Sequence, residues 1–189
     1  MTRRDAAPMP EPSDARLEHP IYVIQKHAAR TLHYDFRLES GGVLKSWAVP
    51  KGPSTDPGQK RLAVPTEDHP MDYASFEGVI PEGQYGAGTV LVWDLGTFRT
   101  LGEKDGKPVS LEDALGRGRA NVWIEGRKIR GGYSLVRTGG APPAARPARR
   151  GWLLIKMNDA EADPGRDPVK SEPASVLSGL TIEQIAAGR

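Results

Sequence analysis

The stretch that most restricts the fold is LHYDFRLE at residues 32–39, in which apolar and polar side chains alternate without exception. A period of two residues is that of a β-strand with one buried face. The apolar set predicts the core-facing side, and the polar set predicts a side that carries either solvent or chemistry. In order, the two sets are Leu32, Tyr34, Phe36 and Leu38, and His33, Asp35, Arg37 and Glu39.

The segments around this strand favour an antiparallel meander. Residues 21–27 and 43–49 are also typical of strands, and SGG at 40–42 is typical of a turn between strands. The 22 glycines, 17 prolines and 6% aromatic residues favour short β elements over a helical bundle. We therefore expect a mainly β fold, with further strands at 61–67, 89–98, 121–126, 128–138 and 151–158.

Two short helices are expected at capping sequences. Ser110 is expected to cap a helix in which Asp113 lies three residues on and which ends at Gly116 or Gly118. Thr181 and Gln184 have capping-box spacing. The chain is then organised as an N-terminal arm at 1–18, a β domain at 19–158, and a polar linker with a short helix at 159–189. Within the β domain, residues 139–150 are expected to form a flexible basic loop.

Composition excludes several kinds of chemistry. The chain has no cysteine, so disulfides and thiolate metal sites are excluded, and any metal needs His, Asp or Glu ligands. No apolar run approaches the ~20 residues that span a bilayer, and the first residues lack the apolar core of a signal peptide. We expect a cytoplasmic protein that does not bind membranes.

Charge is unevenly distributed along the chain. Residues 117–150 carry nine Arg or Lys residues and one acid, Glu125. Such a stretch favours a polyanionic partner, and the alternative is an ordinary solvated linker. Neutralising Arg146, Arg149 and Arg150 should separate the two, because phosphate contacts make binding depend on salt.

Chemistry is expected around His27, His33 and Asp35. Residues 33 and 35 project from one strand face, and His27 ends the preceding strand, so the three side chains can meet. Two imidazoles and a carboxylate form a three-ligand metal site with open positions. Arg37 continues the same face and suits a phosphate that bridges it and the metal. From spacing alone, a solvated polar face remains the alternative.

A family resemblance is carried by two long runs, VIQKHAARTLHYDFRLESGGVLKSWAVPKGPS and KRLAVPTEDHPMDYASFEGVIPEGQYGAGTVLVWD. Over about residues 20–157, the chain resembles the 3′-phosphoesterase domain of bacterial DNA ligase D. The resemblance implies an antiparallel β-barrel core with one or two short helices and flexible termini. It also implies a manganese-dependent enzyme that removes a 3′-terminal ribonucleoside and then the 3′-phosphate, leaving a 3′-hydroxyl.

The resemblance also implies roles for individual residues. The matching positions are His27, His33 and Asp35 for the metal, Arg37, Arg61 and His69 for the phosphate, and Lys51, Glu67 and Tyr73 in support. RDAAPMPEP resembles the family's arm pattern, which would bring Arg4, Asp5 and Glu11 to the substrate. The expected partners are DNA 3′ ends, at primer–templates or terminated by a ribonucleotide.

Three other functions make different demands on the sequence: DNA sealing, oxygenase chemistry and DNA binding without catalysis. A Lys-x-Asp-Gly ligase nucleophile is missing, because Lys104, Asp105 and Gly106 lack the spacer, so a separate DNA ligase and end-joining factors are expected to cooperate. His33 and Asp35 with His69 would also fit a non-haem iron oxygenase triad. A third reading is a non-catalytic DNA-binding barrel with incidental histidines.

Overall fold

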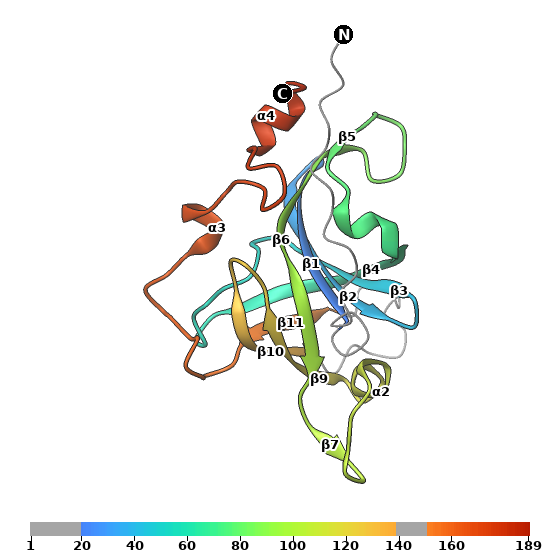
Figure 1. Ribbon diagram of the computed structural model, residues 1–189, viewed down its shortest axis with the longest axis vertical. Coiled ribbons are helices and arrows are strands. Elements are labelled where there is room, and N and C mark those ends of the chain that lie inside the picture. The colour runs from blue at the N-terminus through green and yellow to red at the C-terminus, as the bar shows by residue number, and fades with distance from the viewer. Residues whose placement is uncertain (1–19, 139–150) are drawn as a thin grey trace.

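A computed structural model describes residues 20–138 and 151–189, and it shows a closed antiparallel barrel (Figure 1). Each expected strand is present, longer or shorter than predicted by up to three residues at some ends, and β5, β7 and β8 were not predicted. The strands are β1 (Ile21–Ala28), β2 (Leu32–Ser40), β3 (Val43–Val49), β4 (Lys60–Pro70), β5 (Gly78–Ile80), β6 (Gly88–Thr100), β7 (Glu103–Lys104), β8 (Lys107–Pro108), β9 (Arg119–Glu125), β10 (Arg130–Arg137) and β11 (Trp152–Lys156).

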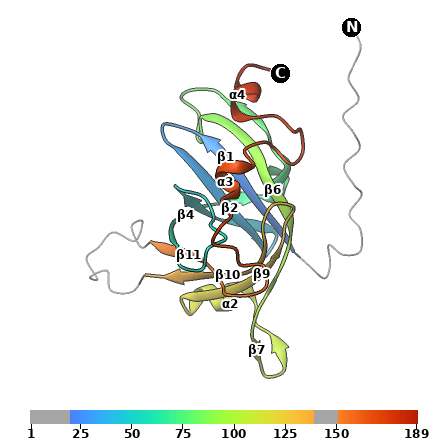
Figure 2. The same ribbon diagram turned by 90° about the vertical axis from the view of Figure 1, so that its left-hand side faces the viewer.

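The barrel contains eight strands in the order β1-β2-β3-β4-β11-β10-β9-β6, and β6 pairs back with β1 to close it. Strand β5 is not one of the eight barrel strands; it pairs with the first residues of β6. Strands β7 and β8 pair with each other in a separate hairpin. The prediction of a mainly β barrel is confirmed. Figure 2 shows the strands crossing as they wrap around the common interior.

Three short α-helices and one 3-10 helix occur in the described part of the chain. They are α2 (Leu111–Gly116), α3 (Pro168–Ser171), α4 (Ile182–Ala186) and η1 (Met71–Ser75). Both predicted caps are confirmed: Ser110 accepts from the Asp113 amide, and Thr181 and Gln184 form a capping box. Neither α3 nor η1 was predicted. None of these helices is long and apolar enough to cross a membrane.

The alternating pattern of β2 separates two environments. Tyr34, Phe36 and Leu38 are buried in the barrel core together with Tyr22 and Trp93. A second, smaller apolar cluster lies on the outer face, where Val23, Leu44 and Val92 pack beneath Ala74 of η1. The segment from η1 to β6 therefore covers the outer face of β1, β2 and β3, which is the face that carries the polar side chains of β2.

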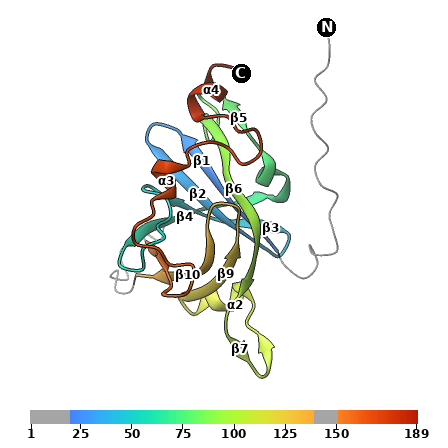
Figure 3. The same cartoon turned by 60° about the vertical axis from the view of Figure 1, so that its left-hand side comes forward.

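The C-terminal segment lies against the barrel. Thr55 Oγ1 lies 2.8 Å from the carbonyl oxygens of both Asp163 and Arg166, and its one proton is shared between them. Ile182 and Ile185 of α4 join the core cluster. Figure 3 shows α4 beside β5 at one end of the molecule and the β7 hairpin at the other. The division into arm, barrel and C-terminal segment stays a prediction, since the arm and the basic loop at 139–150 lie outside the described residues.

Candidate active site

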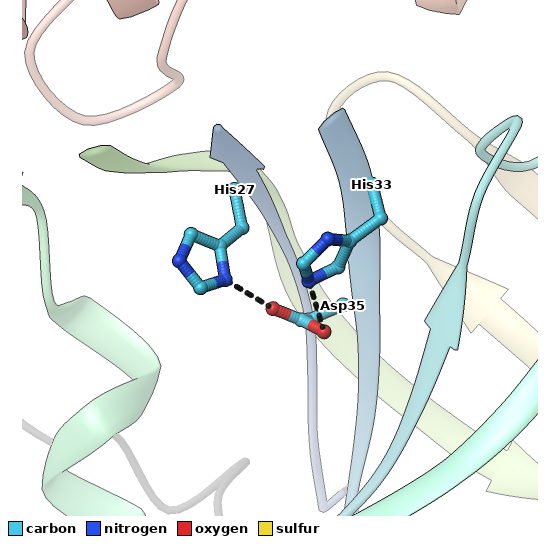
Figure 4. A group of neighbouring side chains, drawn as sticks. All are labelled: His27, His33 and Asp35. Carbon is cyan, nitrogen blue, oxygen red and sulfur yellow. Dashed lines mark ion pairs between the residues drawn. The ribbon is translucent and has the colours of Figure 1, made fainter. Parts of the chain in front are cut away.

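Three potential metal ligands meet at the ends of β1 and β2. His27 lies directly opposite His33 in the strand register, and Asp35 follows two residues later on the same face. His27 Nδ1 is 3.5 Å from Asp35 Oδ2, and His33 Nε2 is 3.3 Å from Asp35 Oδ1 (Figure 4). One ligand atom from each residue lies within 4.8 Å of the others, so one ion can contact all three.

The spacing of these atoms fits a transition-metal ion. Nitrogen and oxygen ligands bind such ions at ~2.1 Å, so two ligands at 90–110° to each other lie about 3.0–3.4 Å apart. The two observed separations, 3.3 and 3.5 Å, are close to that range, although each goes to a different oxygen of Asp35. The three ligand atoms lie within 4.8 Å of one another, so they would move closer together to hold one ion.

Backbone carbonyls orient both imidazoles. His27 Nε2 lies 3.2 Å from the Ala87 carbonyl oxygen, and His33 Nδ1 lies 3.2 Å from that of Thr31. A carbonyl only accepts, so each outer nitrogen carries the proton and each inner nitrogen presents a lone pair toward Asp35. Two lone pairs facing a carboxylate repel it unless a proton or a cation lies between them.

Asp35 is ionised in this setting. Burial by itself raises the pKa of its carboxyl. Hydrogen bonds from His27 and His33, which form when a proton occupies their inner nitrogens, and the charge of Arg37 outweigh burial and hold the pKa well below its usual range. The hydrogen bond to Asp35 in turn raises the pKa of His33. The group therefore contains a permanent buried negative charge at its centre.

Arg37 extends the group along β2 and is almost fully buried, with 3% of its side chain exposed. Its Nη2 is 3.4 Å from Asp35, its Nε donates to Gln25 at 2.7 Å, and its Nη1 donates to Ser46 at 2.8 Å. Gln25 also donates to the Tyr73 carbonyl at 2.7 Å, which ties Arg37 to η1. A guanidinium has five N–H donors, so one on each terminal nitrogen remains for a ligand.

His69 lies beside Arg37. Its Nδ1 is 2.8 Å from the Glu67 carbonyl oxygen and 3.1 Å from Arg37 Nη1. One nitrogen cannot donate to the carbonyl and accept from the guanidinium at once; we assign the proton to the shorter contact with the carbonyl. Burial and the charge of Arg37 lower the pKa of His69, so its ring is neutral near pH 7 with Nε2 free to accept.

A cavity of about 410 Å³ joins these groups, and we call it the His69 cavity. Tyr73 lines it as well, with its ring 4.9 Å from His69 and 5.2 Å from the Arg37 guanidinium. The cavity therefore combines a three-ligand group, a guanidinium and an imidazole. Were an ion held by the three-ligand group, the cavity would suit an anion, because that ion and the Arg37 guanidinium would both carry positive charge. The lining residues are His27, His33, Asp35, Arg37, Thr66, Glu67, Asp68, His69, Pro70, Tyr73, Ile80, Tyr85 and Gly86.

Comparison with known protein families identifies the family to which this site belongs. A family model described as the DNA Ligase D 3′-phosphoesterase domain matches residues 25–137, a range that includes every residue of the His69 cavity. The chain belongs to this family. The resemblance seen in the sequence is thereby confirmed, and the family is a phosphoesterase domain.

Longer proteins of the ligase D family are similar to this chain. The multifunctional non-homologous end joining protein LigD of Pseudomonas aeruginosa is 44% identical over 187 residues, which cover 95% of this chain and 21% of that protein. The multifunctional non-homologous end joining DNA repair protein LigD of Mycobacterium tuberculosis is 47% identical over 141 residues, 72% of this chain and 18% of that protein. The chain thus spans about a fifth of the length of the curated relatives it matches.

Not all residues assigned from the family resemblance gather at the His69 cavity. Arg37, Glu67, His69 and Tyr73 do. Lys51 and Arg61 instead line a different cavity of about 590 Å³ at the mouth of the barrel, with Tyr34, Arg166 and Lys170. The structure therefore does not bring Lys51 and Arg61 to the three-ligand group. Arg4, Asp5 and Glu11 lie outside the described residues.

A bulge explains why Arg61 and His69 of β4 separate. Thr66 is opposite Ser46, but His69 is opposite Leu44, so β4 uses three residues where β3 uses two. The extra residue turns His69 to the outer face. Arg61 keeps the parity of the core residue Ala63, with its Nε buried and, within residues 20–138 and 151–189, without a hydrogen-bond partner.

Sequence reasoning missed several residues of this phosphoesterase site. Gln25 and Ser46 hold Arg37, and Tyr85 lines the cavity. Gln25 could have been found, because it precedes His27 by two residues on the same strand face. For the oxygenase reading, the third member of the group is His27 and not His69, which lies beside Arg37 instead.

Proposed function

We propose that this chain is a metal-dependent phosphoesterase that processes DNA 3′ ends. It removes 3′-terminal ribonucleosides and 3′-phosphates and leaves a 3′-hydroxyl for repair or end joining. The observation that carries the proposal is the three-ligand group of His27, His33 and Asp35, with Arg37 and His69 in the same cavity. Family membership supports the reaction class, and the substrate and its ribonucleoside step are part of the proposal.

Manganese is the ion that we propose for the group. Two imidazoles and one carboxylate suit a transition ion, whereas Mg²⁺ prefers oxygen ligands and gives up water reluctantly. The fixed outer nitrogens of His27 and His33 keep their inner lone pairs available to it. When bound, the ion supplies Lewis-acid stabilisation of charge on the phosphate.

The chain's own residues bind and orient the phosphate. Arg37 is fixed by Gln25, Ser46 and Asp35, so its two remaining N–H donors point in a set direction without further ordering. A preorganised cation in a largely buried position stabilises charge that develops on non-bridging oxygens. Arg37 is therefore the main protein cation for the phosphate in this cavity.

His69 is the proton carrier in this proposal. Because its Nδ1–H is used by the Glu67 carbonyl, only Nε2 exchanges protons with a substrate. A phosphate brings negative charge that opposes the effect of Arg37 on the imidazole and favours a proton at Nε2. That proton is in place for the departing sugar oxygen, which is a poor leaving group as an alkoxide.

The partners proposed are DNA ends together with a separate ligase and end-joining factors. The names of the relatives describe non-homologous end joining, and this chain matches about a fifth of each of them. The sequence has no Lys-x-Asp-Gly nucleophile, so we assign sealing of the end to a separate ligase. Mixing it with a DNA ligase and a nicked substrate that carries a 3′-phosphate should give sealing only when this chain is active.

An activity assay tests the proposal directly. A DNA primer with a 3′-phosphate and one with a single 3′-terminal ribonucleotide are incubated with Mn²⁺, with Mg²⁺ and with a chelator. We expect release of phosphate and of the ribonucleoside with Mn²⁺, and little with Mg²⁺. His33→Ala, purified in the same way, excludes a contaminating phosphatase. Full activity of that variant, or none of the wild type, would disprove the proposal.

A further inference from the structure

A second cavity adjoins the three-ligand group on the side away from Arg37, and we call it the loop cavity. It has a volume of about 1020 Å³ and is lined by the β1–β2 turn and the loop before β6. Four residues, His27, His33, Tyr85 and Gly86, line both this cavity and the His69 cavity. A ligand held at the three-ligand group can therefore extend into either one.

Tyr85 stands between the two cavities with its side chain in solvent. It is 71% exposed, more than any other large apolar or aromatic residue that the structure describes as exposed. A single exposed aromatic is ordinary on a protein surface. This one is unusual in its place, since its ring is 6.5 Å from the ring of His69.

The backbone presents Tyr85 in a fixed way. The Gln84 amide donates to the Pro81 carbonyl at 3.2 Å, and the Ala87 amide donates to the Gln84 carbonyl at 3.1 Å, so two turns follow each other. Gly83 and Gly86 have φ of 84° and 75°, as the third position of a type II turn requires. Tyr85 precedes that position in the second turn, which holds it outward.

The walls of the loop cavity suit a flat, mostly uncharged group. They include Ala28, Ala29, Gly83, Ala87 and Gly88, whose small side chains leave backbone exposed at the wall. Thr31 and Gln84 add hydrogen-bonding groups, Arg30 is a cation at the β1–β2 turn, and Glu82 is an acid on the opposite loop. Small walls, an aromatic ring, amide and hydroxyl groups, and one cation are the features that hold a nucleoside and its phosphate.

We infer that the loop cavity binds the last nucleoside of the strand that is retained, with its base stacked on Tyr85. This inference rests on the proposed function, because it places the 3′-phosphate of that nucleoside at the three-ligand group. The retained nucleoside is present in both substrates, whether the strand ends in a phosphate or in a ribonucleotide. We assign the retained nucleoside to the loop cavity, the larger of the two, and its 3′-phosphate to the His69 cavity.

The experiment compares Tyr85→Ala, Tyr85→Phe and Leu62→Ala. Leu62 is 48% exposed and lines neither cavity, so it is a matched control. Base–aromatic stacking is worth ~1–3 kcal/mol per base, which corresponds to roughly 5–150-fold. We expect Tyr85→Ala to raise KM on both primers by about tenfold, with kcat affected much less. Tyr85→Phe and Leu62→Ala should resemble the wild type.

Two further measurements make the result specific. A 3′-phosphate primer with an abasic sugar at its last position removes the base, so wild type and Tyr85→Ala should then have the same KM. A labelled strand with a 3′-hydroxyl gives Kd by fluorescence anisotropy without turnover, and Tyr85→Ala should raise this Kd by the same factor as KM.

Several outcomes would overturn the inference. They are an unchanged KM in Tyr85→Ala, an equal rise in its KM on the abasic primer, and a rise in KM confined to the ribonucleotide primer. The last result would place the departing nucleoside in the loop cavity. A wild type that hydrolyses neither primer, but whose Kd still depends on Tyr85, would refute the phosphoesterase proposal and leave nucleoside binding supported.

Discussion

Two backbone carbonyls determine what His27 and His33 can do. By accepting from the outer nitrogens, Ala87 and Thr31 leave the inner nitrogens as ligands. His33 and Asp35 differ in how much the fold depends on them, because the His33 side chain is 20% exposed whereas the Asp35 side chain is 8% exposed and paired with Arg37.

We predict that His33→Ala and Asp35→Ala both abolish Mn²⁺ binding and turnover but differ in stability. Removing one partner of a buried ion pair costs up to about 3–5 kcal/mol, so Asp35→Ala should lower the free energy of unfolding. His33→Ala should change it by less than about 1 kcal/mol. Titration calorimetry and urea unfolding measure the two effects. A large loss of stability in His33→Ala would mean that the histidine serves the core.

His69→Ala should slow both reactions alike. The group that departs is a sugar alkoxide in each case, so both need a proton, and general acid catalysis typically contributes 10²–10⁴-fold. We therefore expect kcat to fall about a hundredfold or more on the ribonucleotide primer and on the 3′-phosphate primer. Single-turnover rates with Mn²⁺ provide the measurement. A loss on only one primer would show that His69 positions one substrate and is not the shared acid.

At the scale of elements, the site depends on how closely β6 approaches β1. Gly88, with φ of 129°, begins β6, and a Cβ there would lie 2.3 Å from the carbonyl oxygen of Ala28, the residue after His27. We predict that Gly88→Ala destabilises the protein by several kcal/mol and weakens Mn²⁺ binding, because this backbone must shift. Thermal unfolding and metal titration test it.

Gly116→Ala is the control for that substitution. A Cβ at Gly116, in α2, meets nothing within 4 Å, and alanine favours a helix over glycine by ~1 kcal/mol. Its Tm should stay the same or rise. If Gly88→Ala behaves in the same way, the close contact at the barrel seam does not constrain the site.

The C-terminal segment is held by Lys128 at the β9–β10 turn. Its Nζ donates to the carbonyls of Glu172 and Ala174 and lies 4.7 Å from the centre of the Trp93 ring. We predict that Lys128→Met releases this segment, since two carbonyls lose a charged donor. Hydrogen exchange should then speed up at the Val176 amide, which donates to Val92. Unchanged protection would show that the other contacts of the segment hold it without Lys128.

On the scale of the whole molecule, the group of His27, His33 and Asp35 joins strands of a closed barrel, so ion binding and folding are linked. A ligand at 100 times its Kd stabilises the folded state by about 2.7 kcal/mol. For a chain of this size, 1 kcal/mol shifts Tm by roughly 2–4 °C. We predict that Mn²⁺ at that concentration raises Tm by roughly 5–11 °C, measured by calorimetry. His33→Ala should show no shift, and an equal shift in both would place the ion elsewhere.

The sequence by itself determined the eight strands of the barrel and the membership of the three-ligand group. Strict alternation in β2 assigns Tyr34 and Phe36 to the core and His33 and Asp35 to the other face, because neighbouring side chains of a strand point to opposite sides. His27 follows from the short turn between two pairing strands. The caps of α2 and α4 are equally local, since each needs residues only three positions apart.

Only the tertiary structure decided which distant residues join that group. Residues 61 and 69 are an even number of positions apart, so a regular strand would place both side chains on one face. The bulge in β4 instead places His69 beside Arg37, while Arg61 lines the other cavity. Likewise, Ser46 and Tyr85 reach the site through strand register and loop closure. Periodicity encodes the face of a residue along one strand, whereas bulges and partner strands are selected by the packing of the whole barrel.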